Sequence, residues 1–373
     1  MIPSLENLDW RSFLARPPLP SPPPEVLDAL RQEPILITGA GGSIGSALAL
    51  RLGALAPPKL VLLEASESNL YSLERDWAAA LATNPRAASA MTPILGSVAD
   101  EALLREVFAT HAPRIVFHAA AFKHVPLMEE HPLAAIANNI FATETLTKVA
   151  AAHGARVILL STDKAVEPAS VMGATKRVAE RIVLAAGGTV LRLGNVLASR
   201  DSVAEIFARQ IAQGGPVTVT DSAARRYFLT LDEAVNLLLI AAALPEPSAL
   251  LAPVLPAAHF IADLAHFMAR ELAPDRAITI DFTALRPGDK ETELLWKASD
   301  PTRPAGLNGM LLVETTGLTE AQLAGQLASL RTALDARDHC AALAQLRSMV
   351  PDYTPSQVVL AVSQRHSRRC TYE

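Results

Sequence analysis

From Pro34 to Leu193, short apolar runs alternate with longer amphipathic ones, and this alternation limits the chain to few architectures. The apolar runs have the length and composition of buried strands, whereas the longer runs have helical periodicity. A repeating strand–helix order favours a parallel sheet with helices on both faces, which is a doubly wound α/β fold. The predicted strands are Ile35–Thr38, Leu60–Leu63, Thr92–Leu95, Ile115–His118, Val157–Ser161 and Val190–Leu193; the predicted helices begin at Ile44 or span Glu67–Leu81, Asp100–Ala109, Pro132–Ala152 and Val171–Ala186.

The first predicted strand leads into a glycine-rich turn, Thr38-Gly39-Ala40-Gly41-Gly42-Ser43-Ile44-Gly45. Glycines at 39, 42 and 45 allow a tight turn, close approach of the backbone to a pyrophosphate, and close packing of the helix on the strand. The helix N-terminus, at Ser43 and Ile44, would then face the anion. At the end of the second strand, the Glu64 carboxylate can accept hydrogen bonds from ribose hydroxyls and would repel a 2′-phosphate. We therefore expect a Rossmann-type domain that binds NAD rather than NADP.

Reactive side chains are most concentrated after the fifth predicted strand, in the segment 161–176. Thr162, Asp163 and Lys164 are consecutive there, and Lys176 follows on the next predicted helix. Open α/β sheets bind their ligands at the carboxyl ends of the strands. A carboxylate beside an amine at that edge favours paired acid and base chemistry.

Changes in composition divide the chain into four parts. The proline-rich stretch 17–24 cannot form a helix or a central strand, so we expect residues 1–32 to be an extended leader or linker. Residues 33–195 are predicted to form the NAD-binding domain. Beyond it the elements become irregular, and we expect a smaller substrate-binding region, 196–300, interleaved with the sheet. Residues 301–373 are predicted to be a C-terminal helical extension.

Composition excludes several classes of function. The chain has 33 basic and 38 acidic residues, a net charge of -5, and no basic run that could follow a nucleic-acid backbone. The apolar run Leu237–Leu244 ends at Pro245, far short of the roughly 20 residues that a membrane span needs. No apolar segment near the N-terminus indicates a signal peptide, and the two cysteines, Cys340 and Cys370, favour a reducing compartment. We therefore expect a soluble, cytoplasmic protein without a metal site.

The spacing of the glycines, with the lysine on a later helix, resembles the extended short-chain dehydrogenase/reductase superfamily. Longer motifs over about residues 33–296 resemble the capsular polysaccharide biosynthesis family of UDP-N-acetylglucosamine 4,6-dehydratases. These motifs are Phe117–Glu129, Asn138-Asn139, Ser161–Lys176, Arg192–Leu197, Gly214–Thr220, Arg226-Tyr227-Phe228 and Arg286–Lys290. The resemblance implies cofactor contacts from Ala119, Ala120, Ala121 and Lys176.

In such dehydratases NAD takes a hydride from C4 of the sugar, water leaves from C5 and C6, and the hydride returns to C6. The resemblance implies that Thr162 binds the 4-hydroxyl, Asp163 protonates the leaving 6-hydroxyl and Lys164 takes the C5 proton. Lys164 would need a lowered pKa to act as a base, which we expect from the nearby Lys176. Met172 stands where most relatives carry a tyrosine, and a thioether cannot take a proton. It indicates a dehydratase that retains the C5 configuration, although Met172 also suits an ordinary core position.

The resemblance also implies a nucleotide-sugar site. Asn195 would lie near the substrate phosphates, Arg226 and Arg286 would bind the UDP pyrophosphate, and Lys123 and His124 would approach the sugar. Some positions depart from the family pattern: Ala142, Ala198 and Asp201 replace glycines, and Glu205 replaces a proline. The carboxylates of Asp201 and Glu205 would weaken the binding of a phosphate at this site unless they point to solvent. We expect a homo-oligomer, and two alternatives stay open: a nucleotide-sugar epimerase, and a non-catalytic cofactor-binding partner of a polysaccharide machine.

Overall fold

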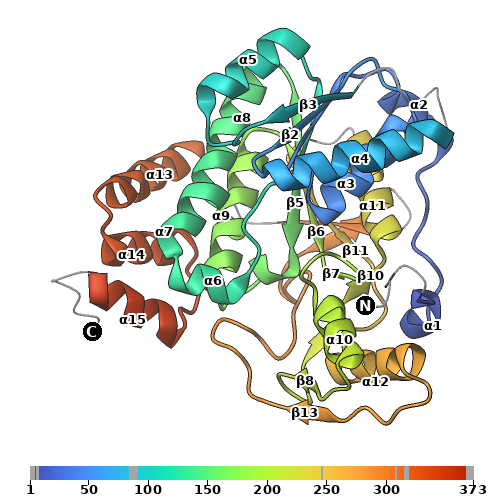
Figure 1. The fold of residues 1–373 in the computed structure, drawn as a ribbon. Helices are drawn as coiled ribbons and strands as arrows, with labels where there is room; N and C mark the ends of the chain where they lie inside the picture. Colours follow the sequence, from blue (N-terminus) through green and yellow to red (C-terminus); the bar gives the residue numbers. More distant parts are fainter. Residues whose placement is uncertain are drawn as a thin grey trace.

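A mostly parallel sheet forms the centre of the molecule (Figure 1). The computed structural model describes residues 5, 8–83, 91–244, 247–306, 309–314 and 319–366. The nine strands lie in the order β14-β15-β11-β6-β5-β4-β1-β2-β3, parallel from β3 to β11 and antiparallel at β15 and β14. Their bounds are β1 Ile35–Thr38, β2 Leu60–Glu64, β3 Met91–Leu95, β4 Ile115–His118, β5 Arg156–Thr162, β6 Thr189–Leu193, β11 Leu250–Pro253, β14 Thr302–Pro304 and β15 Met310–Val313. This order confirms the predicted doubly wound fold and places the switch of direction between β1 and β4.

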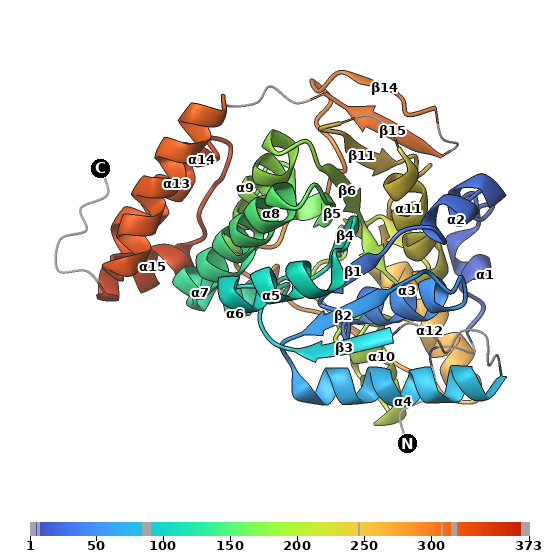
Figure 2. The same ribbon diagram turned by 90° about the horizontal axis from the view of Figure 1, so that it is seen from above.

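Helices cover both faces of the sheet (Figure 2). One layer holds α5 (Glu101–His111), α8 (Ala142–Ala152) and α9 (Val171–Ala185), and the other holds α2 (Pro24–Leu30), α3 (Ser43–Gly53) and α11 (Leu231–Ala243); α4 (Glu67–Thr83) lies beside β3. The central strands are buried on both faces, which explains why they read as continuous apolar runs.

The predicted helix Pro132–Ala152 is divided in the structure. A short helix α7 (Pro132–Ala135) passes into a π-helical stretch, η3 (Ile136–Phe141), before α8 begins. A further helix, α6 (Val125–Glu130), precedes them. The π-helical stretch turns Asn139 toward the backbone of Phe122, which the amide binds at both its N–H and its C=O. Such stretches often occur at functional sites.

Beyond the carboxyl ends of the strands lies a smaller lobe, seen at the bottom of Figure 1. Helices α10 (Val203–Ala212) and α12 (Ile261–Leu272) pack together, and three two-stranded sheets join them. Their strands are β7 Asn195–Val196 with β10 Phe228–Leu229, β9 Arg225–Arg226 with β12 His259–Phe260, and β8 Val217–Val219 with β13 Ile280–Phe282.

The described part of the leader packs against the rest of the molecule. Its helix α1 (Trp10–Leu14) places Phe13 against Phe228 and Phe267 of the lobe. Arg16 forms a buried ion pair with Glu233 of α11 at 2.6 Å. Helix α2, which follows the proline-rich stretch, buries Val26 and Leu30 in the main core. The expected extended spacer is therefore held by packed helices on both sides.

The C-terminal part begins with the strands β14 and β15, so it is not purely helical as we expected. Three helices then follow, α13 (Glu320–Asp335), α14 (His339–Met349) and α15 (Gln357–His366). Helix α14 packs against α7 and α9, α15 packs against α6, and α13 packs on α14. Of the two cysteines from which we inferred a reducing compartment, Cys340 lies on α14 and Cys370 lies outside the described residues. Among the helices of the described residues, none has the length and apolar character needed to cross a bilayer.

Candidate active site

The glycine turn has the close packing that the sequence predicted. Gly39 has a φ of 68°, and a Cβ there would lie 2.6 Å from the Ala120 nitrogen. A Cβ on Gly45 would lie 2.1 Å from the Gly39 oxygen, so α3 packs directly on the turn. Gly42 is the N-cap of α3, and no side chain of the described residues caps this helix end. The turn thus offers an uncapped helix N-terminus at the carboxyl end of β1, which suits a phosphate group.

Glu64 is buried at the end of β2, and both of its oxygens bind the backbone. Oε2 accepts from the Gly41 N–H and Oε1 from the Ser66 N–H, each at 2.9 Å. Each carboxylate oxygen can accept a second bond, so Glu64 could hold the ribose hydroxyls as well. The turn, the free helix end and this carboxylate together fit a dinucleotide, which Gly39, Gly42, Ser43, Ile44, Gly45 and Glu64 would hold beside Ala119, Ala120 and Ala121.

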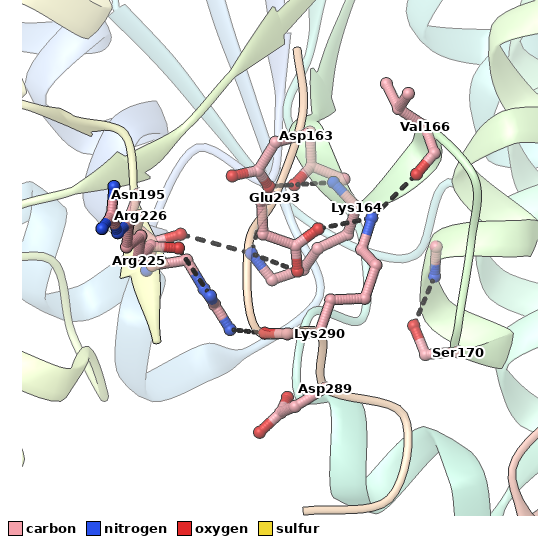
Figure 3. A network of polar contacts seen from close by, with 12 residues as sticks. Asp163, Lys164, Val166, Ser170, Asn195, Arg225, Arg226, Asp289, Lys290 and Glu293 are labelled. Atoms are coloured by element: carbon pink, nitrogen blue, oxygen red, sulfur yellow. Dashed lines mark hydrogen bonds and ion pairs between the residues drawn. The ribbon is translucent and has the colours of Figure 1, made fainter. Parts of the chain in front are cut away.

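Polar side chains gather at the carboxyl end of β5 (Figure 3). Thr162 donates to Asp163 Oδ1 at 2.8 Å, and Lys164 Nζ donates to the same oxygen at 3.1 Å. Lys164 also reaches Asn195 Oδ1 at 3.2 Å and lies 3.9 Å from Glu293. Asp163 is fully buried, and its Oδ2 has no hydrogen-bond partner among the described residues. An acid, an amine and a hydroxyl therefore share one small volume, as the sequence predicted.

The expected lowering of the Lys164 pKa is wrong. Burial lowers this pKa, but the carboxylates of Asp163 and Glu293 outweigh burial and raise it above the ordinary value. Lys164 is therefore an ammonium group in the resting site. The sequence could not predict this sign, because Glu293 comes from a loop far along the chain.

Lys176 is the amine with the lowered pKa. It is buried on α9 and donates to the Leu160 oxygen at 2.7 Å. Desolvation lowers its pKa to about 8, although the Glu180 carboxylate opposes this. Four residues earlier, Met172 is buried in an apolar cluster that includes Val125 and Met128. A Cβ on Gly173 would lie 2.2 Å from the Lys164 oxygen, so this glycine lets α9 approach the Asp163–Lys164 turn.

Two groups near the site were missed as functional residues. Asn139 is buried, and its Nδ2 donates to Thr175 Oγ1 at 3.1 Å, which ties η3 to α9. His118 bonds Thr38 at 2.7 Å and Thr143 at 2.9 Å. Burial first, and Lys176 second, lower the His118 pKa to about 3, so this ring is neutral. The Asn138-Asn139 pair was a visible signal for the first, whereas His118 looked like the end of an ordinary strand.

A buried network of charged side chains beside the site links α9 to β5 and β6. Glu180 accepts from Ser161 at 2.6 Å and from two nitrogens of Arg192 at 2.8 and 2.7 Å. Ser161 and Arg192 are register partners on β5 and β6, so one carboxylate of α9 binds both strands. Burial alone would raise the Glu180 pKa, but Arg192 and its hydrogen bonds lower it to about 2.

The expected substrate residues surround this group unevenly. Arg226 donates to the carbonyls of Arg225, Lys290 and Glu291, so it holds the loop that follows Arg286 (Figure 3). Lys290 in turn binds the Val166 oxygen at 2.8 Å and Glu293 at 2.6 Å. Arg286 is exposed and pairs with Asp289. The structure brings Asn195 and Arg226 to the Lys164 group and leaves Arg286 at the rim.

Lys123 and His124 lie at another edge, beside the loop 197–202. Lys123 donates to the Arg200 oxygen at 2.6 Å, and His124 lies 3.7 Å from Asp201. Glu205 accepts from the Asp201 N–H at 2.6 Å and lies 3.6 Å from Arg209. The carboxylates of Asp201 and Glu205, which depart from the family pattern, thus each have a partner nearby. No group of three or more His, Cys, Asp or Glu side chains in the described residues is arranged to hold a metal ion.

Known proteins resemble this chain in sequence. The probable polysaccharide biosynthesis protein EpsC of Bacillus subtilis is 37% identical over 301 residues, which cover 78% of this chain and 49% of EpsC. The UDP-glucose 4-epimerase of Rickettsia rickettsii is 35% identical over 221 residues, 56% of this chain and 62% of that protein. The chain spans about half the length of EpsC.

Solved structures resemble it in fold. Pen from Bacillus thuringiensis is 25% identical, with a TM-score of 0.70, over 80% of this chain and 98% of Pen. DesIV, a dTDP-glucose 4,6-dehydratase from Streptomyces venezuelae solved with NAD, is 19% identical, with a TM-score of 0.58, over 69% of this chain and 87% of DesIV.

A family model described as polysaccharide biosynthesis protein matches residues 35–315. That span runs from β1 through β15, so it takes in the whole sheet, the glycine turn and the smaller lobe. The chain therefore belongs to the polysaccharide biosynthesis protein family.

Proposed function

We propose that the protein is an NAD-dependent nucleotide-sugar 4,6-dehydratase. It converts UDP-N-acetylglucosamine to a UDP-4-keto-6-deoxy sugar, with the C5 configuration retained as Met172 indicates. The observation that carries the proposal is the group of Thr162, Asp163 and Lys164 at the carboxyl end of β5. Family membership supports it, and so does the fold that the chain shares with DesIV.

Bound NAD would supply the hydride acceptor for C4 and return the hydride to C6. The chain supplies the rest. The glycine turn and Glu64 bind the dinucleotide, and Lys176 lies buried on the helix that borders β5. Asn195, Arg226 and Arg286 bind the nucleotide end of the substrate, while Lys123 and His124 border the sugar side.

Loss of water from C5 and C6 needs a base and an acid, and the Asp163–Lys164 pair can become both. The resting pair carries one proton, on the Lys164 ammonium that donates to Asp163. Transfer of this proton breaks the N–H bond, forms an O–H bond on Asp163, and leaves a neutral amine beside a carboxylic acid. A bound sugar that excludes water favours this neutral pair, because it removes the solvation of both charges.

The elimination then restores the pair. Lys164 takes the C5 proton, and Asp163 gives its proton to the 6-hydroxyl, which leaves as water. Thr162 donates a hydrogen bond to Asp163 in the resting site and can turn to the 4-hydroxyl when the sugar binds. Asp163 Oδ2, buried without a hydrogen-bond partner among the described residues, is an available position for the transferred proton.

A nucleotide-sugar epimerase is the second candidate, and the similarity to the Rickettsia epimerase favours it. Reversal of configuration at C4 needs no acid for a leaving 6-hydroxyl, however, so it leaves the Asp163–Lys164 pair without a purpose. The third possibility is a cofactor-binding protein without turnover. The carboxylates of Asp201 and Glu205 had favoured this third possibility, because they would weaken a phosphate site. In the structure Asp201 lies beside His124 and Glu205 accepts from the Asp201 N–H, so they give it less support.

The test is incubation with UDP-N-acetylglucosamine and catalytic NAD in deuterated water, followed by NMR and mass spectrometry. We expect a 4-keto-6-deoxy sugar with deuterium at C5, no net NADH, and retained C5 configuration. Asp163→Asn should still bind NAD but form no product. A C4 epimer without deuterium would instead identify an epimerase. NAD binding with no product from any UDP-sugar would identify the non-catalytic protein. Light scattering on the same sample tests the expected homo-oligomer.

A further inference from the structure

The loop 197–202, which follows β7, reaches across to the glycine turn, and we call it the strap. The Arg200 backbone N–H donates to Ser43 Oγ at 2.8 Å. The Arg200 side chain donates from Nη1 to the Gly41 oxygen at 2.9 Å and to Asn69 Oδ1 at 3.0 Å. One arginine of the smaller lobe thus binds the turn, the first residue of α3 and the first part of α4.

The backbone of the strap is held in a specific shape. Ala198 and Asp201, on either side of Arg200, have φ values of 57° and 56°, a left-handed region that residues with a Cβ disfavour. Such a conformation persists only where other contacts fix it. Lys123 binds the Arg200 oxygen and Glu205 binds the Asp201 N–H, so contacts on both sides fix the direction of the Arg200 side chain.

Arg200 and Glu64 bind the same residue of the turn. Glu64 accepts from the Gly41 N–H, and Arg200 donates to the Gly41 C=O. In a Rossmann-type domain the carboxylate after the second strand receives the ribose hydroxyls, and an arginine nearby accommodates a 2′-phosphate. A guanidinium has five N–H donors, so Arg200 can keep both of its acceptors and still donate to a phosphate. The guanidinium on the Gly41 oxygen therefore adds a positive charge to the same turn residue that the Glu64 carboxylate binds.

We propose that Arg200 is a cofactor-binding residue at the adenosine ribose, and that it lets the site accept NADP as well as NAD. The inference rests on the cofactor class of the proposed function and adds the specificity of that site. It requires neither the dehydratase reaction nor a particular sugar.

The test is titration of the purified protein with NAD and with NADP by calorimetry, without substrate. Wild type should bind the two with dissociation constants within about tenfold of each other. Arg200→Gln should weaken NADP binding by about tenfold or more and NAD binding by less than about threefold, because only NADP presents the extra phosphate. Arg200→Lys should fall between them. The control is Arg105→Gln on α5, an exposed arginine paired with Glu101, which should change neither constant.

Other outcomes overturn the proposal. Equal weakening of both cofactors by Arg200→Gln would mean that Arg200 only fastens the strap. Unchanged constants would place Arg200 away from the ribose, and a wild type that binds only one of the two cofactors would contradict the proposed dual specificity. Thermal unfolding checks that each variant folds, and Arg200→Lys still gives the ratio if Arg200→Gln does not fold. A protein that binds both cofactors yet forms no sugar product would sink the dehydratase and leave the role of Arg200 standing.

Discussion

Glu293 is almost fully buried, 3.9 Å from Lys164 and 2.6 Å from Lys290, so its charge acts directly on the proposed base. Together with Asp163 it raises the Lys164 pKa. Glu293→Gln removes one of the two negative charges, so the Lys164 pKa should fall. Because the active pair keeps the proton that Asp163 later gives to the 6-hydroxyl, loss of this proton from Lys164 at high pH ends activity, so the falling limb of kcat/KM against pH should move to lower pH by about one unit.

Glu291→Gln is the matched control, since that side chain is exposed two residues away and only its backbone oxygen binds Arg226. It should leave the limb in place. A limb that stays fixed in Glu293→Gln, or moves to higher pH, would show that Lys164 is not the base.

At the scale of single residues, the site could be predicted from the sequence only in part. Thr162, Asp163 and Lys164 are neighbours in the chain and could be predicted together, whereas Glu293 joins them only through the fold.

Among the elements, the buried strands were the most predictable. The strands Ile35–Thr38 and Ile115–His118 have the predicted bounds, because each is an apolar run fixed on both sides by turn residues. The π-helical stretch in the middle of Pro132–Ala152 was not predictable, since it depends on hydrogen bonds between Asn139 and the distant Phe122. The short strands β14 and β15 were missed for a similar reason, as β15 forms by pairing with β11 and β14 by pairing with β15.

The leader shows the same dependence on tertiary contacts, and it permits a stability prediction. Glu233 is buried and accepts from Arg16 at 2.6 and 2.8 Å and from the Leu19 N–H at 2.9 Å. Arg16→Ala leaves this carboxylate without its charged partner, so the free energy of unfolding in urea should fall by about 3 kcal/mol. Arg31→Ala removes the exposed pair with Asp28 in the same leader and should cost less than about 1 kcal/mol. Equal small losses would mean that the leader is only loosely attached.

Over the whole molecule, several ionisable groups are buried between the sheet and its helices, and they respond to different ranges of pH. Glu180 is stabilised as a carboxylate, with a pKa of about 2 against an ordinary 4.5. Its contribution is complete above pH 4.5 and is lost as the pH falls toward 2. Lys176, with a pKa of about 8, is protonated in both the folded and the unfolded chain well below that pH. Neither group therefore changes stability between pH 5 and 6.5.

His118 does act in that interval, because its pKa is about 3 in the folded protein and 6.5 ordinarily. Below pH 6.5 the unfolded chain binds a proton that the folded one refuses, so stability falls by about 1.4 kcal/mol per pH unit. Urea unfolding at pH 7, 6 and 5 should show this slope in wild type. His118→Asn should be less stable at pH 7, because it disturbs the bonds to Thr38 and Thr143, but its stability should change less with pH. The lowered pKa values of His111 and His259 act in both proteins and cancel in the comparison. Parallel curves for the two proteins would mean that His118 takes up its proton in the folded state, and that the sheet beside the glycine turn tolerates a charge there.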